Sequence, residues 1–435
     1  MAQQIIIKGT PVTAANEVLV ADSNSKIPAV DGSQVTAMSG TNVSTGTVAT
    51  ARLDTGTTAN KIVVLDGTAK VPAVDGSLLT GIVSYTKNAS DPTVSTNPSG
   101  GVGTEWVNHT SGKQFICTDA TTGANVWKIS GGHSGDIKPY YPYGEISGYA
   151  CGGYTGSASS DVIDKFSFTS DGSATDVGNM TLARHSVSGS SSATHGYTHG
   201  GYYPSAWADR IDRFSFSVDG NMTDVGNLFL TRQSAGASSS ETHGYLAGGG
   251  NSTTPADQGI NGIEKFAYAA LSNGTDVGNL TMQVMSASAT SSLTHGYRQG
   301  GRISGARHDV IERWPFASDS NSVDVGNLLA IVSNCSMNGQ NSSTHGYAAS
   351  GEGTGNATRI QKYQFAASSN ATSVGTLTGD RSAGAGSSST THGYVAGGPD
   401  TPLNVIEKWS FTSDGNSSDV GDLTVARVGT AGCSS

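Results

Sequence analysis

The sequence predicts an all-β protein whose C-terminal two thirds form a six-bladed β-propeller. Three observations predict it: a phrase of about fifty residues occurs six times, every copy contains the same four strand-like segments, and the C-terminal residues supply a strand that the first copy lacks. A repeat of this length is typical of solenoids, propellers and arrays, because each unit buries its apolar face against the next.

The first two strands of each copy flank the tag Thr-His-Gly-Tyr. A run of small residues precedes the tag, and a short segment ending in a small-residue doublet, usually Gly-Gly, follows it. Glycine tolerates the backbone of a tight turn, so the tag predicts a hairpin between these strands. The first copy has the degenerate tag Ile146–Tyr149. The other five tags are Thr194–Tyr197, Thr242–Tyr245, Thr294–Tyr297, Thr344–Tyr347 and Thr391–Tyr394.

The third strand has the same pattern in all six copies: Ile, an acid or Gln, Lys or Arg, an aromatic residue, any residue, and a second aromatic residue, as in Ile211–Phe216. Apolar residues on both faces predict a strand in a sheet that lies between neighbouring sheets. The turn Val218–Asn221 then leads to a fourth, outermost strand, Thr223–Leu230. Four antiparallel strands per unit describe one blade of a propeller.

The ends of the repeat region predict how the ring closes. The first copy begins at its tyrosine strand, and residues 427–435 match Arg184–Ser192 without the turn. We therefore expect the C-terminal strand to pair with Tyr149–Gly153 and complete the first blade, which buries otherwise unpaired strand edges. The Gly doublet after an aromatic strand and the Arg before the inner strand resemble kelch-type propellers over residues 147–435. The resemblance implies a kelch-like propeller.

Residues 1–82 contain an unrelated repeat, in which residues 15–38 match residues 59–82 and both copies contain Pro-Ala-Val-Asp-Gly-Ser. One such chain buries too little apolar surface to offset its ordering entropy. The segment is therefore either a flexible leader or, as we favour, a shaft in which several identical chains wind together. It resembles the shaft repeats of bacteriophage tail and neck fibres, which implies a parallel homotrimer.

The next segment, residues 83–130, resembles a small β-meander module of phage fibre proteins. The resemblance rests on Glu-Trp-Val-Asn at 105–108, Ser-Gly-Lys at 111–113, Phe-Ile-Cys at 115–117 and Val-Trp-Lys at 126–128. Residues 131–146, which contain Lys-Pro-Tyr-Tyr-Pro-Tyr, are expected to be a linker with a semi-rigid end. The domain boundaries are thus 1–82, 83–130, 131–146 and 147–435.

These resemblances imply a virion protein, made in the host cytoplasm, that attaches to tail, neck or baseplate proteins through its N-terminus. The leading hypothesis is a tail-fibre adhesin that binds a host cell-surface glycan. The alternative is a head, neck or collar fibre without its own receptor. A glycan-degrading enzyme is a third and weaker hypothesis, so we expect no enzyme activity.

Composition and repeated polar residues exclude several other classes. The net charge is −10 without a basic patch, which argues against nucleic acid as a partner, and no segment has the ~20 apolar residues needed for membrane insertion. No cofactor or metal site is expected, because the tag histidines fall at one repeated turn position and Asp-Val-Gly-Asn lacks calcium-loop spacing. The repeated arginines (Arg184, Arg232, Arg381, Arg427) are expected to bond neighbouring blades. The four cysteines, Cys117, Cys151, Cys335 and Cys433, are expected to be free thiols.

A residue present in every blade is usually architectural, so function is expected in the loops that differ, between the second and third strands. Exposed Tyr and Trp beside guanidinium donors suit sugar rings, which stack one apolar face and present hydroxyls at the edge. The alternative is that these aromatic residues cover neighbouring loops. The candidate glycan-binding residues are Tyr154, Tyr202, Tyr203, Trp207, Arg302 and Arg307.

Overall fold

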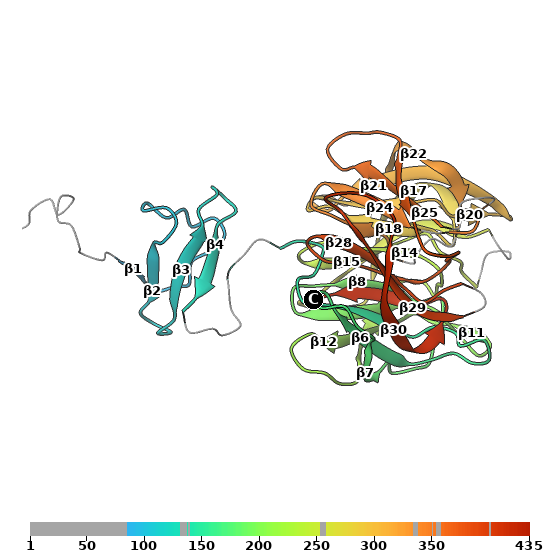
Figure 1. Ribbon diagram of the computed structural model, residues 1–435, viewed down its shortest axis with the longest axis horizontal. Helices are drawn as coiled ribbons and strands as arrows, with labels where there is room; N and C mark the ends of the chain where they lie inside the picture. The colour runs from blue at the N-terminus through green and yellow to red at the C-terminus, as the bar shows by residue number, and fades with distance from the viewer. Residues whose placement is uncertain are drawn as a thin grey trace, which may run out of the picture. The chain divides into compact units, whose positions relative to one another are not determined.

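The computed structural model describes residues 85–130, 137, 140–252, 258–333, 338–349, 351–353, 358–399 and 402–435. In these ranges the chain consists of strands, turns and irregular segments, without a helix, and its sheets are antiparallel (Figure 1). The predicted all-β class is therefore confirmed. The repeats predicted as a fibre shaft at residues 1–82 lie outside the described residues.

The first sheet occupies the segment in which a β-meander is expected. Its strands follow one another in chain order, so each pairs with the next. The core of this sheet includes Trp106 and Trp127, whose rings meet edge to face with centroids 5.8 Å apart, together with Phe115 and Cys117. The strands are β1 (Tyr85–Asn88), β2 (Glu105–Asn108), β3 (Gln114–Asp119) and β4 (Val126–Ile129).

Six further sheets, here numbered 1 to 6, are found in the described part of residues 147–435, and each contains the four strands expected of one repeat. Consecutive residues Ile211 and Asp212 on the third strand of sheet 2 are both fully buried, so both faces of this sheet are covered. Sheet 1 contains β31 (Ala431–Ser434), β5 (Ser147–Cys151), β6 (Val162–Ser167) and β7 (Thr175–Asn179); sheet 2 contains β8 (Ser188–Ser191), β9 (His195–His199), β12 (Arg210–Ser215) and β13 (Thr223–Asn227); sheet 3 contains β14 (Gly236–Ser239), β15 (His243–Ala247), β16 (Ile260–Ala267) and β17 (Thr275–Val284).

The remaining three sheets repeat this order, with short hairpins added at the loops of sheets 2 and 4. Sheet 4 contains β18 (Ser288–Ser291), β19 (His295–Gln299), β21 (Ala306–Pro315) and β22 (Val323–Val332); sheet 5 contains β23 (Gln340–Asn341), β24 (His345–Ala349), β25 (Arg359–Gln364) and β26 (Thr372–Thr376); sheet 6 contains β27 (Ala385–Ser388), β28 (His392–Ala396), β29 (Leu403–Ser410) and β30 (Ser418–Arg427). The added strands are β10 (Tyr202–Tyr203), β11 (Ala206–Trp207) and β20 (Arg302–Ile303).

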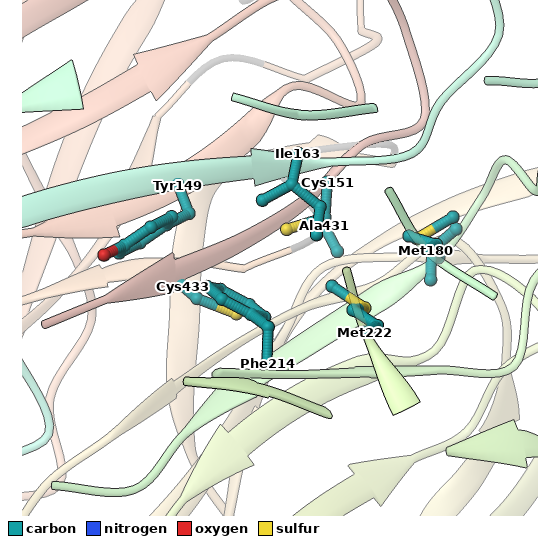
Figure 2. Close-up of a cluster of buried hydrophobic side chains, with 9 residues drawn as sticks. Tyr149, Cys151, Ile163, Met180, Phe214, Met222, Ala431 and Cys433 are labelled. Atoms are coloured by element: carbon teal, nitrogen blue, oxygen red, sulfur yellow. The ribbon is translucent and has the colours of Figure 1, made fainter. Parts of the chain in front are cut away.

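The C-terminal strand completes sheet 1. Strand β31 pairs with β5 in antiparallel register, with Ala431 opposite Cys151 and Cys433 opposite Tyr149, as the sequence predicted. Its apolar side chains join a buried cluster with Tyr149 and Ile163 of sheet 1 and Phe214 of sheet 2 (Figure 2). The last strand of the chain is therefore part of the core between sheets 1 and 2.

The first strands of the six sheets, here called the inner strands, contact one another in order. Strand β8 contacts β14, and the contacts continue through β18, β23 and β27 to β31, which contacts β8 again. Serine hydroxyls accept hydrogen bonds from the backbone of the preceding inner strand: Ser191 N donates to Ser239 Oγ (3.0 Å), Ser388 N to Ser434 Oγ (3.1 Å) and Ser434 N to Ser191 Oγ (3.1 Å). Small residues at these positions allow the strands to approach this closely.

The repeated arginines form buried ion pairs. The predicted bond between neighbouring sheets is found at Arg427, the last residue of β30 in sheet 6, whose Nη2 lies 2.6 Å from Asp164 of sheet 1. Arg184 differs from the prediction. Arg184 Nη2 lies 2.5 Å from Asp212 within sheet 2, and both side chains are fully buried. The link to the preceding sheet is instead made by Thr181, whose hydroxyl donates to Asp212 at 2.8 Å. Each arginine thus neutralises the buried acid of the sheet whose inner strand follows it in the chain, because an unpaired carboxylate there would be costly, and the acid joins two sheets.

Two repeats lack the arginine, and in both of them other residues keep the buried acid position free of an unpaired charge. In sheet 4, Val284 occupies the arginine position, and Arg298 on the second strand pairs with Glu312 at 2.7 Å. In sheet 5 the arginine position is Val332 and the acid position is the neutral Gln361, so no buried charge remains to be paired. The described cysteines Cys117, Cys151 and Cys433 are buried free thiols, as expected, whereas Cys335 lies outside the described residues.

The phrase Asp-Val-Gly-Asn has an architectural role. Gly178 adopts a φ of 153°, and a Cβ built there would lie 2.4 Å from the carbonyl oxygen of Gly220 in the turn of the next sheet. Asn179 N then donates to Asn221 Oδ1 in that turn at 3.0 Å. The phrase is repeated because it allows the turn of the next sheet to pack against the outer strand.

Candidate functional site

The candidate site lies where each sheet is entered, just before its inner strand. In sheets 1 to 5 the residue after the arginine position forms a backbone bridge with the residue after the Gly doublet of the same sheet, as His185 does with Tyr202 and Met285 with Arg302. The sequence forms this arrangement because the doublet glycines adopt positive φ, 57° at Gly200 and 98° at Gly201, and turn the chain back toward the inner strand. The same bridge joins Tyr154 to Val428, Gln233 to Gly250 and Ser333 to Glu352.

In the entry segments of sheets 1, 2, 3, 4 and 6 the next residue adopts a left-handed backbone. We call these residues the rim; they are Ser186, Ser234, Ser286, Ala383 and Gly429, with φ of 54°, 52°, 56°, 49° and 68°. Hydrogen bonds connect the rim from sheet to sheet: Ser234 N donates to Ser186 O at 3.0 Å, and Ser286 N donates to Ser234 O at 2.9 Å. A non-glycine residue in this region costs about 1–3 kcal/mol and persists only where its surroundings enforce it. The rim is therefore a constrained structure.

A cavity of about 540 Å³ opens at the rim. Its volume lies within the range of about 300–1,000 Å³ that is usual for small-molecule sites. Most of its polar lining is neutral, with serine hydroxyls, a glutamine amide and two tyrosines, and Arg302 adds a cation. The described lining residues are Tyr154, His185, Ser186, Tyr202, Gln233, Ser234, Met285, Ser286, Arg302, Ala383, Val428 and Gly429.

Three aromatic rings form one wall of this rim cavity. His185 lies between Tyr154 and Tyr202, with ring centroids 5.4 Å from each. Ser159 Oγ lies 3.0 Å from His185 Nδ1 and fixes the orientation of the imidazole. Burial lowers the pKa of His185 below its usual 6.5, so the ring is neutral at neutral pH. The wall therefore presents uncharged aromatic surface.

The rim cavity combines a constant framework with a variable lining. The arginine position, the left-handed residue and the Gly doublet recur from sheet to sheet, whereas the residue after the doublet differs in nearly every sheet. It is Tyr154, Tyr202, Gly250, Arg302, Glu352 and Pro399 in sheets 1 to 6. The residue after the arginine position also varies, with serine alone occurring twice; it is Val428, His185, Gln233, Met285, Ser333 and Ser382 in sheets 1 to 6. Residues with only an architectural role would be expected to repeat, so this variation makes the rim cavity the candidate for a specific binding site.

The sequence-predicted residues separate into two groups. Tyr154, Tyr202 and Arg302 line the rim cavity together, although they lie in three different sheets. The cavity lining does not include Tyr203, Trp207 or Arg307. Trp207 instead packs edge-on against Tyr202, with ring centroids 6.5 Å apart, so for this residue the alternative interpretation of a loop-covering aromatic fits better.

The other two residues outside the lining have local contacts. Arg307 Nε donates to Ser333 Oγ at 3.2 Å, and its guanidinium lies 3.3 Å from Glu352. Tyr203 pairs with Ala206 in the β10–β11 hairpin. Sequence reasoning missed His185, Gln233 and Met285. The signal that was available is variation at one repeated position directly after the arginine.

The opposite end of the inner strands is closed. A smaller cavity of about 40 Å³, lined mainly by Ser, Thr, Asn and Gly of the inner strands, lies there beside Pro142. The segment that enters the six sheets covers it: Tyr140 Oη donates to Ser191 O at 3.1 Å, and Asn341 Nδ2 donates to Pro142 O at 3.1 Å. The rim cavity is therefore at the end of the inner strands remote from the incoming chain.

The tag histidines were expected in the hairpin turn, but each is the first residue of the second strand of its sheet, directly after that turn. In sheet 2, Thr194 Oγ1 lies 2.8 Å from His195 Nδ1, and His195 N donates to Ser192 Oγ at 3.0 Å. The same Thr–His contact recurs at His243, His295, His345 and His392. Across the described residues, no group of three or more His, Cys, Asp or Glu side chains is placed to hold a metal ion. That part of the chain also has no helix long and apolar enough to span a membrane.

Comparison of the chain with protein-family models and with curated proteins found no match. The function must therefore be argued from the fold and the rim cavity.

Proposed function

We propose that the six sheets close into a six-bladed, kelch-like β-propeller. The cyclic contacts of the inner strands support this arrangement, because β31 of sheet 1 contacts both β27 of sheet 6 and β8 of sheet 2. The outer part of the ring gives independent support: Lys408 of sheet 6 forms an ion pair with Asp171 of sheet 1. Closure of this kind removes exposed strand edges.

We further propose that the chain is a bacteriophage fibre protein, a tail-fibre adhesin whose propeller binds a glycan on the host surface. In this proposal residues 1–82 attach to other virion proteins and trimerise, and the propeller presents the binding site. The observation that carries the proposal is the rim cavity, which is variable in its lining and lies at the end of the inner strands remote from the incoming chain.

The chemistry of the rim cavity supports a sugar ligand. Tyr154 and Tyr202 offer apolar faces for stacking, and the serine hydroxyls of the rim offer hydrogen-bond donors and acceptors. Each site can be weak, since several copies per fibre and several fibres per particle raise avidity by about 10²–10⁴ where geometry allows simultaneous engagement.

Cell binding tests the proposal. Purified protein is expected to bind cells of the bacterial host and to block virion adsorption. Tyr202→Ala is expected to weaken both at least about tenfold, which corresponds to the loss of ~1.4 kcal/mol. The matched control is Val218→Ala in an exposed turn of the same sheet. Wild-type-like binding by Tyr202→Ala would remove the site assignment. Immunogold labelling at the head or collar would favour the decoration fibre instead.

A further inference from the structure

We infer that the rim cavity binds the terminal sugar of a glycan chain, end-on, at one site per polypeptide; this inference rests on the proposed glycan-binding function. An end-on site recognises the last sugar of a chain and excludes sugars within it. Three features of the described structure carry the inference: the axis behind the cavity is blocked, the cavity is lined for a sugar, and its lining breaks the sixfold repeat.

The inner strands leave no passage along their common axis. A Cβ built on Gly432 of β31 would lie 1.9 Å from Gly386 O of β27, and one on Gly189 of β8 would lie 2.3 Å from Gly432 O. Backbones in such direct contact occlude the axis at this level. The cavity beside Pro142 at the other end of these strands has a volume of about 40 Å³, which is room for a few water molecules. A glycan cannot thread through, so the rim cavity is blind.

The lining of the rim cavity suits a sugar more than an apolar ligand. The aromatic wall of Tyr154, His185 and Tyr202 is held in place by the Ser159 contact to His185. The rim serines and the Gln233 amide supply neutral hydrogen-bonding groups next to that wall. A sugar ring stacked on a tyrosine would present its hydroxyls to these groups, which matches the division of a sugar into apolar faces and polar edges.

The aromatic residues of the rim cavity are confined to sheets 1 and 2, and this limits the number of sugar-stacking sites per chain. Six equivalent entry segments could provide six equivalent subsites, but the position after the Gly doublet is aromatic in sheets 1 and 2 alone. In sheets 3, 5 and 6 it is Gly250, Glu352 and Pro399. One aromatic wall therefore implies one stacked sugar per chain.

The experiment uses the full-length protein and an array of paired oligosaccharides. In each pair the same hexose stands at the non-reducing end or is capped by one further sugar residue. We expect binding to uncapped members and at least tenfold weaker binding to their capped partners. Calorimetry with the best uncapped binder is expected to give one site per chain.

Two variants test whether the rim cavity is responsible. Gln233→Trp places a large side chain in the cavity and is expected to abolish binding both to the array and to host cells. The matched control, Val218→Trp, adds the same side chain to an exposed turn and is expected to bind normally. Tyr202→Ala, which removes bulk instead of adding it, is expected to weaken binding as well.

The outcomes distinguish this inference from the proposed function. Equal binding of capped and uncapped members, several sites per chain, or cell binding that Gln233→Trp leaves intact would overturn end-on recognition while glycan or cell binding stands. Absence of binding to both the array and host cells would overturn the proposed function, and the inference with it.

Discussion

At the scale of single residues, the repeated buried arginines are each paired with a carboxylate of opposite charge. Arg184 and Asp212 are both fully buried and 2.5 Å apart, and Arg427 is paired in the same way with Asp164 at 2.6 Å. Sheet 5 shows the other solution, in which Val332 and Gln361 replace both charges. The two solutions in one chain allow a direct comparison of their stability.

Replacing Arg184 by Met is expected to destabilise the fold by about 3–5 kcal/mol, because the Asp212 carboxylate then stays buried without its cation. The double variant R184V/D212Q reproduces the neutral pair of sheet 5 and is expected to recover more than half of that loss. Urea unfolding monitored by tryptophan fluorescence measures both. As a control, Lys165→Met removes an ion pair with the exposed Asp219 and is expected to cost about 0–1 kcal/mol. A double variant no more stable than Arg184→Met would contradict this account.

At the scale of elements, the repeated pattern was sufficient to predict the strands. The Ile and aromatic positions of the third strand predicted its place in each sheet, because they depend on local periodicity. The tag glycine was wrongly placed in the hairpin turn: Gly196 lies in β9, where a Cβ would come within 2.3 Å of the Phe214 ring. The pairing of β31 with β5 was also predictable, because the first repeat lacks an inner strand and the C-terminal residues supply an additional one.

The C-terminal strand gives a prediction at this scale. Deleting residues 428–435 removes β31, which leaves the edge of β5 unpaired and uncovers Tyr149, Cys151 and Ile163. We expect amide hydrogens of β5 to lose their protection from exchange, whereas those of the β2–β3 pair keep theirs. A peptide of residues 427–435 added in trans is expected to restore part of the protection. Unchanged protection of β5 in the truncated protein would show that β31 does not hold sheet 1.

The residues of the candidate site were predictable only in part, because the site is formed by two chain segments and sequence reasoning identified only one of them. Tyr154, Tyr202 and Arg302 were found because variable loops carry function. His185, Gln233 and Met285 were missed because each follows a constant arginine or its replacement, in a segment that sequence reasoning assigned to architecture. Only the backbone bridge between the two segments, such as His185 with Tyr202, shows that both positions face one cavity. That bridge depends on the left-handed rim, which a sequence rich in serine does not reveal.

At the scale of the whole molecule, contacts divide the chain into Met1–Tyr85 and Thr86–Ser435. The proposed fibre function assigns attachment and assembly to the first of these units and ligand binding to the second. A blind, end-on site on each propeller gains most when several propellers are held together, because each contact buries only one sugar and avidity supplies the remaining affinity. We therefore expect trimerisation through the proposed shaft to increase the apparent affinity of the rim cavity for a surface that carries many glycans.

Sedimentation of the full-length protein tests whether the shaft holds several chains together. We expect it to sediment as a complex of three 44.1-kDa chains, because a single copy of the repeats in residues 1–82 buries too little apolar surface to be ordered alone. A fragment of residues 86–435, which keeps the second contact unit intact, is expected to sediment as a monomer and to bind host cells about 10²–10⁴-fold more weakly. A monomeric full-length protein, or a fragment that binds cells as tightly as the full chain, would contradict the shaft and the avidity that follows from it.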